Sequence, residues 1–375
     1  MKIRAAVLRS SPVSRPYAET RPLTIESVEL APPQRGEVLI KVAAVGLCHS
    51  DLSVINGDRP RQIPMVLGHE AAGIVEALGE GVDDLVPGDH VVMSFVPTCG
   101  VCPSCMEGRA QLCGPGQAAN GAGTLLGGGR RLACDDGTDL YHLCGISGFG
   151  DHAVVSRRSI VKIDKEMSLV DAALFGCAVM TGVGTIVNTC NVRPGQSVAV
   201  VGLGGVGLSA VMGAVATGAD RIIAIDLAQQ KLDLALSVGA TDGFLASDPD
   251  IVEKVKAATG GGVDHAVEMA GSAPAFELAY KITRRGGTTA TGGLANPNAR
   301  ISLPPVQLVG EERTIKGSYM GSCVPLRDIP RFMALYKRGR LPVDRLLSGT
   351  GPLEEINAAL DRLDRGEVVR HVIVY

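Results

Sequence analysis

The sequence predicts an α/β protein in two parts, a β-rich domain and a second domain of βαβ units around a parallel sheet. The chain has 375 residues, more than one hydrophobic core usually serves, so two domains are expected. Short Val/Ile-rich runs separated by Gly/Pro turns fill about the first 160 residues, a pattern typical of β structure. From about Met180 onward, apolar runs alternate with helical stretches, which is typical of a parallel sheet with crossover helices.

Each element follows from its local pattern. In the β-rich part we expect strands at 37–44, 72–78, 90–93 and 152–155. In the second part we expect strands at 197–201, 221–225, 265–267 and 287–291. The tail predicts amphipathic helices at 326–337 and 353–364 and a final strand at 368–375.

Composition narrows the class of protein. Hydrophobic residues make up 46% of the chain, charged residues 20%, and the formal net charge is −3, which is the balance of a globular chain and not of a disordered one. The absence of a basic excess argues against a nucleic-acid partner. The N-terminus has too short an apolar run for a secretory signal, so we expect a cytoplasmic protein.

The uncharged stretch 198–219 is long enough to span a bilayer. Four glycines, at 202, 204, 205 and 207, stand between a β-branched run and a helix-like stretch at 208–216. Strand, turn and helix explain this pattern better than a membrane span, and we expect no membrane partner.

Four of the ten cysteines lie close together in the sequence. They are Cys99, Cys102, Cys105 and Cys113, separated by Gly, Pro and Ser. Four thiolates can close a tetrahedral zinc site that supports structure, here a protruding loop, and leaves no position open for chemistry. A zinc ribbon of a nucleic-acid binder shares this spacing, but the charge balance disfavours it.

A glycine-rich turn follows the strand expected at 197–201. Its glycines are Gly202, Gly204, Gly205 and Gly207, and a helix begins there. Such glycines let backbone N–H groups approach a pyrophosphate at a helix N-terminus. Asp226 ends the next strand, where a carboxylate can accept hydrogen bonds from an adenosine ribose and repel a 2′-phosphate. NAD is therefore favoured over NADP.

A third set of residues is dispersed along the chain. Cys48 and Asp51 lie in one loop, His69 and Glu70 at the start of a strand, and Cys177 just before the second domain. A Cys/His/Cys set leaves the fourth position of a tetrahedral zinc open, which a catalytic metal requires.

Together these motifs, in this order, resemble the zinc alcohol dehydrogenases of the medium-chain dehydrogenase/reductase family over nearly the whole chain. The resemblance implies a GroES-like catalytic domain formed by residues 1–178 and 320–375 around a Rossmann domain at 179–319, with the active site in the cleft between them. It also implies two zinc ions per chain. Cys48, His69 and Cys177 would bind the catalytic zinc with Glu70 and Asp51 behind them, and the four clustered cysteines would bind the structural zinc.

The same resemblance assigns further roles. His49 and Arg370 would contact the cofactor phosphates, Asp226 and Lys231 the adenosine ribose, and Thr181 and Val206 the nicotinamide. The zinc would act as a Lewis acid that lowers the pKa of the bound alcohol. Ser50 would relay the alcohol proton. Ser53 stands where many relatives carry the histidine that ends this relay.

Positions matching the family's substrate pocket are mostly apolar or aromatic. They are Ser50, Arg59, Phe95, Leu143, Cys144, Leu294 and Tyr319. Such a slot favours a primary aliphatic or aromatic alcohol. Three related substrate classes fit less well. Members that oxidise the glutathione adduct of formaldehyde usually carry threonine at position 50 and an acid at position 59. Polyol dehydrogenases commonly lack the third cysteine ligand, and cinnamyl-alcohol enzymes typically use NADP. Arg59 and the neighbouring Arg61 could instead hold a remote carboxylate or phosphate.

Two expectations stay open at this stage. A non-catalytic NAD-binding sensor could share this fold, although it would not need an open zinc. About thirty-five residues separate Cys113 from Phe149, a long loop that resembles the dimeric branch of the family, so a homodimer is expected ahead of a tetramer.

Overall fold

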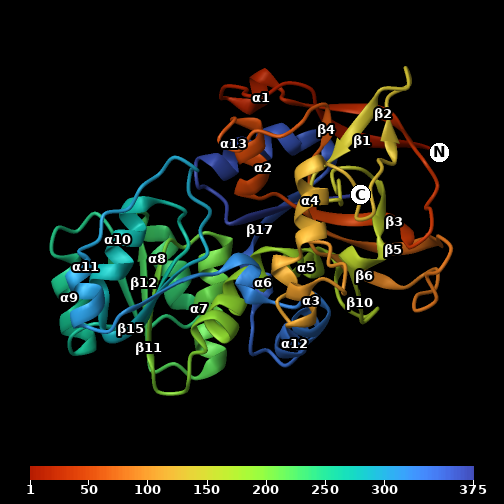
Figure 1. Cartoon of the computed structure of the whole chain (residues 1–375). Helices are drawn as coiled ribbons and strands as arrows, with labels where there is room; N and C mark the ends of the chain where they lie inside the picture. The colour runs from red at the N-terminus through yellow and green to blue at the C-terminus, as the bar shows by residue number, and fades with distance from the viewer. The chain divides into compact units, whose positions relative to one another are not determined.

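The computed structural model of the chain describes residues 1–375, which divide into two units. The first unit joins Met1–Cys177 to Val324–Pro330 and Leu346–Tyr375, and the second joins Ala178–Cys323 to Arg331–Arg345. Both chain ends lie in the first unit (Figure 1).

The first unit contains two sheets. A closed barrel has the strand order β1-β2-β7-β8-β4, and a seven-stranded sheet has the order β10-β6-β5-β3-β18-β17 with β9 paired to β3. The barrel strands are β1 (Lys2–Leu8), β2 (Leu23–Leu30), β4 (Met65–Val66), β7 (Leu132–Ala133) and β8 (Asp139–His142). The strands of the larger sheet are β3 (Glu37–Gly46), β5 (Glu70–Leu78), β6 (His90–Met93), β9 (His152–Ser156), β10 (Ile160–Ile163), β17 (Leu347–Gly351) and β18 (Arg370–Val374).

Short helices lie between these strands or follow them. They are α1 (Tyr17–Thr20), α2 (His49–Ile55), α3 (Pro103–Met106), α4 (Gly114–Ala122), α5 (Leu169–Ala173) and α13 (Ile356–Asp364). Asp361 of α13 accepts hydrogen bonds from the backbone N–H groups of Tyr17 and Ala18, each at 2.7 Å. This satisfies donors at the start of α1 that have no partner inside the helix, and it joins the C-terminal segment to the N-terminal one.

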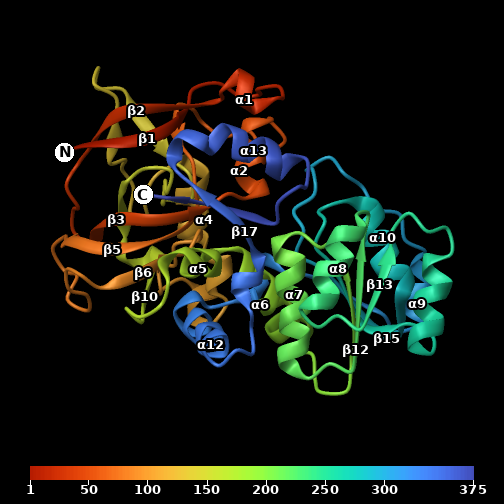
Figure 2. The same ribbon diagram turned by 180° about the vertical axis from the view of Figure 1, so that it is seen from behind.

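The second unit contains a parallel sheet of six strands in the order β13-β12-β11-β14-β15-β16. Its strands are β11 (Ser197–Val201), β12 (Arg221–Asp226), β13 (Asp242–Leu245), β14 (Val263–Glu268), β15 (Thr283–Thr291) and β16 (Thr314–Gly317). Its helices include α6 (Ala178–Gly184), the π-helical turn η4 (Thr185–Cys190), α7 (Gly205–Thr217), α8 (Gln229–Ser237), α9 (Ile251–Thr259), α10 (Ala273–Ile282) and α11 (Pro305–Gly310). Helices lie on both faces of the sheet (Figure 2). This strand order is that of a Rossmann fold, with its switch point between β11 and β14.

The α/β fold class is confirmed, and so is every predicted strand and tail helix, with changes of a few residues at their ends. The uncharged stretch 198–219 folds as β11, a turn and α7. No single helix of the chain is long and apolar enough to cross a membrane, although one bent pair of helices reaches the length and composition of a span.

One expected boundary differs from the structure. The predicted first domain includes residues 320–375, but 320–323 and 331–345 belong to the second unit, and α12 (Pro325–Lys337) is divided between the units. At 320–323 the reason is local packing. Asn188 donates to the Gly321 carbonyl at 3.2 Å, and the Cys323 thiol lies 3.4 Å from the Met180 carbonyl oxygen.

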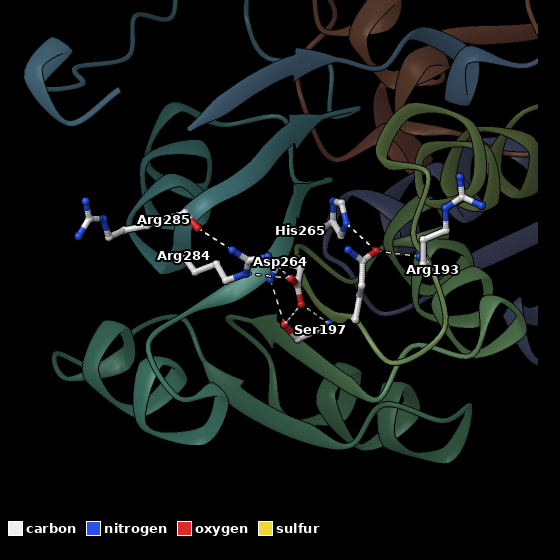
Figure 3. A network of polar contacts seen from close by, with 7 residues as sticks. Arg193, Ser197, Asp264, His265, Arg284 and Arg285 are labelled. Atoms are coloured by element: carbon white, nitrogen blue, oxygen red, sulfur yellow. Dashed lines mark hydrogen bonds and ion pairs between the residues drawn. The ribbon is translucent and has the colours of Figure 1, made fainter. Parts of the chain in front are cut away.

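A carboxylate joins the amino-terminal ends of β11 and β14. Asp264 Oδ2 accepts hydrogen bonds from the Ser197 backbone N–H at 2.8 Å and from the Ser197 hydroxyl at 2.7 Å. Its other oxygen accepts from Arg284 Nε at 2.8 Å, as Figure 3 shows. Asp264 therefore links β11, β14 and β15 at this end of the sheet.

Candidate functional site

The loop that carries Cys48 is held by Asp51. Cys48 precedes the first residue of α2, and its backbone N–H donates to Asp51 Oδ2 at 3.2 Å. Asp51 Oδ1 accepts from the Gly68 N–H at 3.1 Å and lies 3.2 Å from His69 Nδ1. The fully buried Asp51 carboxylate thus joins the Cys48 loop to the start of β5, and it directs the other nitrogen of His69 away from itself.

Four possible metal ligands meet at this place in the first unit. The ligand atoms of Cys48, His69, Glu70 and Cys177 all lie within 4.8 Å of one another, and all four residues are buried. Close backbone packing positions Cys177: a Cβ on the preceding Gly176 would lie 2.3 Å from the Met93 carbonyl oxygen. Sequence positions more than one hundred residues apart, Cys48 and Cys177, are thereby brought together.

Glu70 also faces Arg370 of β18. The Arg370 Nε and Glu70 Oε2 atoms lie 3.3 Å apart, and both side chains are buried. Burial raises the pKa of the Glu70 carboxyl to about 7, although Arg370 opposes this shift. A hydrogen bond from Cys177 is the main cause that lowers the pKa of the Cys48 thiol well below its usual value.

This donor set fits a zinc ion. Two thiols and one imidazole are the ligands of a catalytic zinc that keeps a fourth position open. Both oxygens of Glu70 are buried without a hydrogen-bond partner, and Arg370 faces Oε2 as an ion pair, so the negative charge beside the three ligands also favours a cation there. The structure brings together Cys48, His69, Cys177, Glu70 and Asp51 as the sequence predicted.

The four clustered cysteines form a second candidate metal site. The thiols of Cys99, Cys102, Cys105 and Cys113 lie within 4.8 Å of one another, and none is in a disulfide. Backbone N–H groups point at two of the sulfurs: Cys99 N lies 3.2 Å from Cys113 Sγ, and Cys102 N lies 3.3 Å from Cys99 Sγ. Such N–H···S contacts favour thiolates, the form that binds zinc, and at Cys113 they oppose burial, which raises the pKa of that thiol.

The predicted substrate-pocket residues fall in both units. In the first unit, Phe95 packs edge-on against the His69 ring with centroids 5.8 Å apart. Ser50 is half-buried in α2, and Leu143 and Cys144 follow β8, whose residue Tyr141 pairs with Met65 just before the His69 loop. Ser50, Arg59, Phe95, Leu143 and Cys144 belong to the first unit, and Leu294 and Tyr319 are exposed residues of the second.

In the second unit, the glycine-rich turn fits a dinucleotide. Gly202 has a left-handed φ of +94°, and a Cβ there would lie 2.6 Å from the Ala270 N atom. A Cβ on Gly207 would lie 1.8 Å from the Gly202 carbonyl oxygen, so α7 packs directly on the turn. At Gly204 nothing lies within 4 Å of such a Cβ. That open space at the start of α7 is where a pyrophosphate can approach backbone N–H groups.

The predicted ribose and nicotinamide residues lie around this turn. Asp226 accepts from Leu203 N at 2.7 Å and from Ala228 N at 3.1 Å, and it lies 3.9 Å from Lys231 Nζ. A Cβ on Gly182 would lie 2.2 Å from the Val206 carbonyl oxygen, so α6 and α7 touch where Thr181 and Val206 stand. Of the predicted phosphate contacts, His49 is exposed on α2, and Arg370 is the buried partner of Glu70.

Sequence reasoning missed Glu268. It ends β14, is 1% exposed, and accepts hydrogen bonds from the two loops that leave β14 and β15. Like Asp226, Glu268 is an acid at the carboxyl end of a predicted strand. Gly271 follows Glu268 three residues later. That signal could have been read from the sequence.

Comparisons with known proteins agree with this geometry. Residues 34–165 match the family model of the alcohol dehydrogenase GroES-like domain, and residues 205–338 match that of the zinc-binding dehydrogenases. The chain is 39% identical to an S-(hydroxymethyl)glutathione dehydrogenase of Escherichia coli over the full length of both chains. A solved structure of an alcohol dehydrogenase zinc-binding domain protein from Burkholderia ambifaria is 35% identical, with a TM-score of 0.94 over 100% of this chain and 99% of that one. Benzyl alcohol dehydrogenase from Acinetobacter calcoaceticus is 31% identical, with a TM-score of 0.92 at the same coverage.

Proposed function

Because the chain belongs to the zinc-dependent alcohol dehydrogenases of the medium-chain dehydrogenase/reductase family, we propose that it oxidises a primary aliphatic or aromatic alcohol to the aldehyde, with NAD as hydride acceptor. The observation that carries this proposal is the buried cluster of Cys48, His69 and Cys177 ligand atoms, supported from behind by Asp51. A sensor that only binds NAD would not need three metal ligands with an open fourth position.

A zinc ion bound to this cluster would supply Lewis acidity that lowers the pKa of the alcohol. The chain's own residues would then handle the proton. Ser50 stands two residues after Cys48 and is half-buried in α2, where its hydroxyl would accept the alcohol proton and pass its own proton on toward the cofactor ribose. The Ser53 hydroxyl donates to the His49 carbonyl at 2.8 Å, so Ser53 is engaged with the backbone of its own helix.

The substrate proposal rests on the apolar surroundings of the cluster. Phe95 against His69, together with the buried Leu143, supports an aliphatic or aromatic group next to the reacting carbon. The benzyl alcohol dehydrogenase neighbour is consistent with this class. The E. coli relative is named as an S-(hydroxymethyl)glutathione dehydrogenase. The hydroxymethylated thiol is therefore the alternative substrate for this chain, and it belongs in the same assay.

The cofactor proposal rests on Asp226. Its carboxylate is held by Leu203 N and Ala228 N at the end of β12, where it would accept bonds from a ribose and repel a 2′-phosphate. A second zinc at Cys99, Cys102, Cys105 and Cys113 completes the proposal, with a structural role only.

One set of measurements tests these statements. We expect metal analysis to return two zinc ions per chain, and a panel of alcohols with NAD to produce NADH absorbance, strongest with aliphatic and benzylic primary alcohols. Formaldehyde with glutathione is the comparison substrate. One zinc per chain and no turnover across the panel would instead favour an NAD-binding sensor.

We also propose that the protein is a homodimer. The strand β16 is at the edge of the parallel sheet, and all of its residues are exposed. Next to it in the sequence, Val306 and Val309 of α11 are 77% and 79% exposed. An open strand edge flanked by apolar side chains is a surface that a second copy can cover. Light scattering should return twice the chain mass, and Ile315→Lys on β16 should return the monomer.

A further inference from the structure

Glu268 is a buried carboxylate with no cationic partner. Its Oε1 accepts from Gly271 N at 2.5 Å and from Ser272 N at 3.4 Å, and its Oε2 accepts from the Thr291 hydroxyl at 2.6 Å. A buried charge is costly unless hydrogen bonds compensate it. Here the compensation comes entirely from two loops, 269–272 after β14 and 291–293 at the end of β15.

These loops lie at the end of the sheet where ligands bind in this fold. The Glu268 carbonyl oxygen also accepts from Gly292 N at 3.0 Å and Gly293 N at 3.1 Å. The strand order reverses between β11 and β14, and a dinucleotide lies across that point. With Asp226 on β12 assigned to the adenosine half, the nicotinamide half falls on the side of β14 and β15.

The packing leaves these loops little freedom. A Cβ on Gly293 would lie 2.8 Å from Glu268 Oε2, so the β15 loop rests directly on the carboxylate. The β14 loop touches the glycine-rich turn, since a Cβ on Gly202 would lie 2.6 Å from Ala270 N. A shift of the Glu268 carboxylate would therefore move both loops.

We propose that Glu268 is a positioning residue that holds the loops after β14 and β15 in place for the nicotinamide half of the cofactor. The proposal rests on the proposed use of a nicotinamide dinucleotide. Glu268 acts through Gly271 N, Ser272 N and Thr291, whose bonds to a carboxylate are stronger than bonds to a neutral acceptor. The adenosine half is held at β11 and β12, where Asp226 stands, and depends on Glu268 less directly.

The same strand offers a matched control. Asp264 stands near the amino-terminal end of β14 and, like Glu268, accepts a backbone N–H and a hydroxyl (Figure 3). It lies at the opposite end of the strand from the cofactor loops. Asp264→Asn therefore removes a carboxylate that also binds Arg284, at a place remote from the two loops that Glu268 holds.

The experiment compares two ligands on the zinc-loaded protein. NADH carries both halves, whereas ADP-ribose lacks the nicotinamide, so the ratio of their dissociation constants measures what the nicotinamide adds. We expect Glu268→Gln and Thr291→Val to weaken NADH binding by about tenfold, the effect of losing one hydrogen bond to a charged group. ADP-ribose binding should weaken by a smaller factor, because its pyrophosphate lies at the glycine-rich turn that the β14 loop touches. Thr291→Ser, which keeps the hydroxyl, and Asp264→Asn should both retain the wild-type ratio.

The proposal would be overturned if Glu268→Gln and Thr291→Val left the ratio of the two dissociation constants at its wild-type value, whether or not both affinities fell. Both dissociation constants are measured on the same protein sample. An unfolded fraction of a variant weakens both apparent affinities equally and leaves their ratio unchanged. A wild-type protein that binds NADPH more tightly than NADH would refute the NAD proposal by itself. The ratio is then measured with NADPH and 2′-phospho-ADP-ribose, and it still decides the role of Glu268.

Discussion

Asp51 Oδ1 lies 3.2 Å from His69 Nδ1, and the same carboxylate accepts the backbone N–H groups of Gly68 and Cys48. One buried side chain thus orients two of the proposed zinc ligands. An imidazole that donates its Nδ1–H to a carboxylate presents Nε2 to the metal, with its ring orientation set.

The first prediction concerns this carboxylate. Asp51→Asn keeps the shape of the side chain but cannot accept from three donors at once. We expect the affinity for the catalytic zinc to fall by about ten- to a hundredfold, the usual effect of losing such a partner. Zinc release to a chelator measures it, and the zinc at the four cysteines serves as the internal control. Release of both ions at wild-type rates would contradict this role for Asp51.

Ser50 is the subject of the second prediction. Ser50→Ala should lower turnover by roughly a hundredfold, the effect of a lost proton-transfer group, while both zinc ions stay bound. Ser53→Ala is the matched control, because the Ser53 hydroxyl already donates to the His49 carbonyl. Turnover near the wild-type value across the pH range in Ser50→Ala would remove Ser50 from the mechanism.

A related change tests how the proton leaves. Ser53→His restores the residue that many relatives carry at this position, and we expect it to raise activity at lower pH, where a better proton acceptor matters most. An unchanged pH profile would argue against a relay through position 53.

Cofactor choice gives the third prediction. Asp226→Asn keeps an oxygen to accept from Leu203 N but removes the charge that would repel a 2′-phosphate. The preference for NAD over NADP, taken as the ratio of specificity constants, should therefore relax. Asp242→Asn on the neighbouring strand β13 changes the net charge equally and should leave the ratio alone. Equal ratios in wild type and Asp226→Asn would refute this role.

Arg59 and Arg61 lead to the fourth prediction. Both lie between α2 and β4, and Arg61 is exposed. Burial raises the pKa of the Cys144 thiol, and the charges of His69 and Arg61 oppose this shift. An alcohol with a carboxylate at its far end should be used better than the neutral alcohol of equal length, mainly through a lower Michaelis constant. Arg59→Leu and Arg61→Leu should weaken this preference, as should added salt. Equal specificity constants for the two alcohols at low salt would assign both arginines to the solvated surface.

The fifth prediction concerns stability against acid. Burial, with Arg131 and Arg130 nearby, lowers the pKa of His142 to about 3. Its ring accepts from the Arg131 N–H at 3.1 Å and contacts the Ser147 hydroxyl at 2.9 Å. Above pH ~6.5 the histidine is neutral in both states, and as the pH falls only the unfolded chain takes up the proton. The free energy of unfolding should therefore decrease from pH ~6.5 toward pH 3.

His142→Gln removes this proton uptake and keeps an acceptor for the Arg131 N–H. Urea unfolding of both proteins at several pH values measures the difference between them. The variant should lose less stability than wild type between pH 7 and pH 5. Parallel curves would show that His142 does not contribute to the pH dependence.

Local patterns in the sequence were sufficient to predict the helices and strands, the glycine-rich turn and the four-cysteine site. The strand at 197–201, the glycine turn and the helix after it are set by β-branched residues and by glycine conformations within one short segment. The four cysteines lie within fifteen residues, so their loop needs little more than its own turns to bring the thiols together.

Tertiary structure alone decided which distant side chains share a site. Cys48, His69 and Cys177 meet because the Cys48 loop, the start of β5 and the turn at Gly176 pack on one another, and Arg370 reaches Glu70 because β18 pairs with β3. The division of residues 320–375 between the two units, and the two loops joined by Glu268, follow equally from packing. Such contacts depend on hydrogen bonds and excluded volume between segments far apart in the chain, and no pattern within one segment records them.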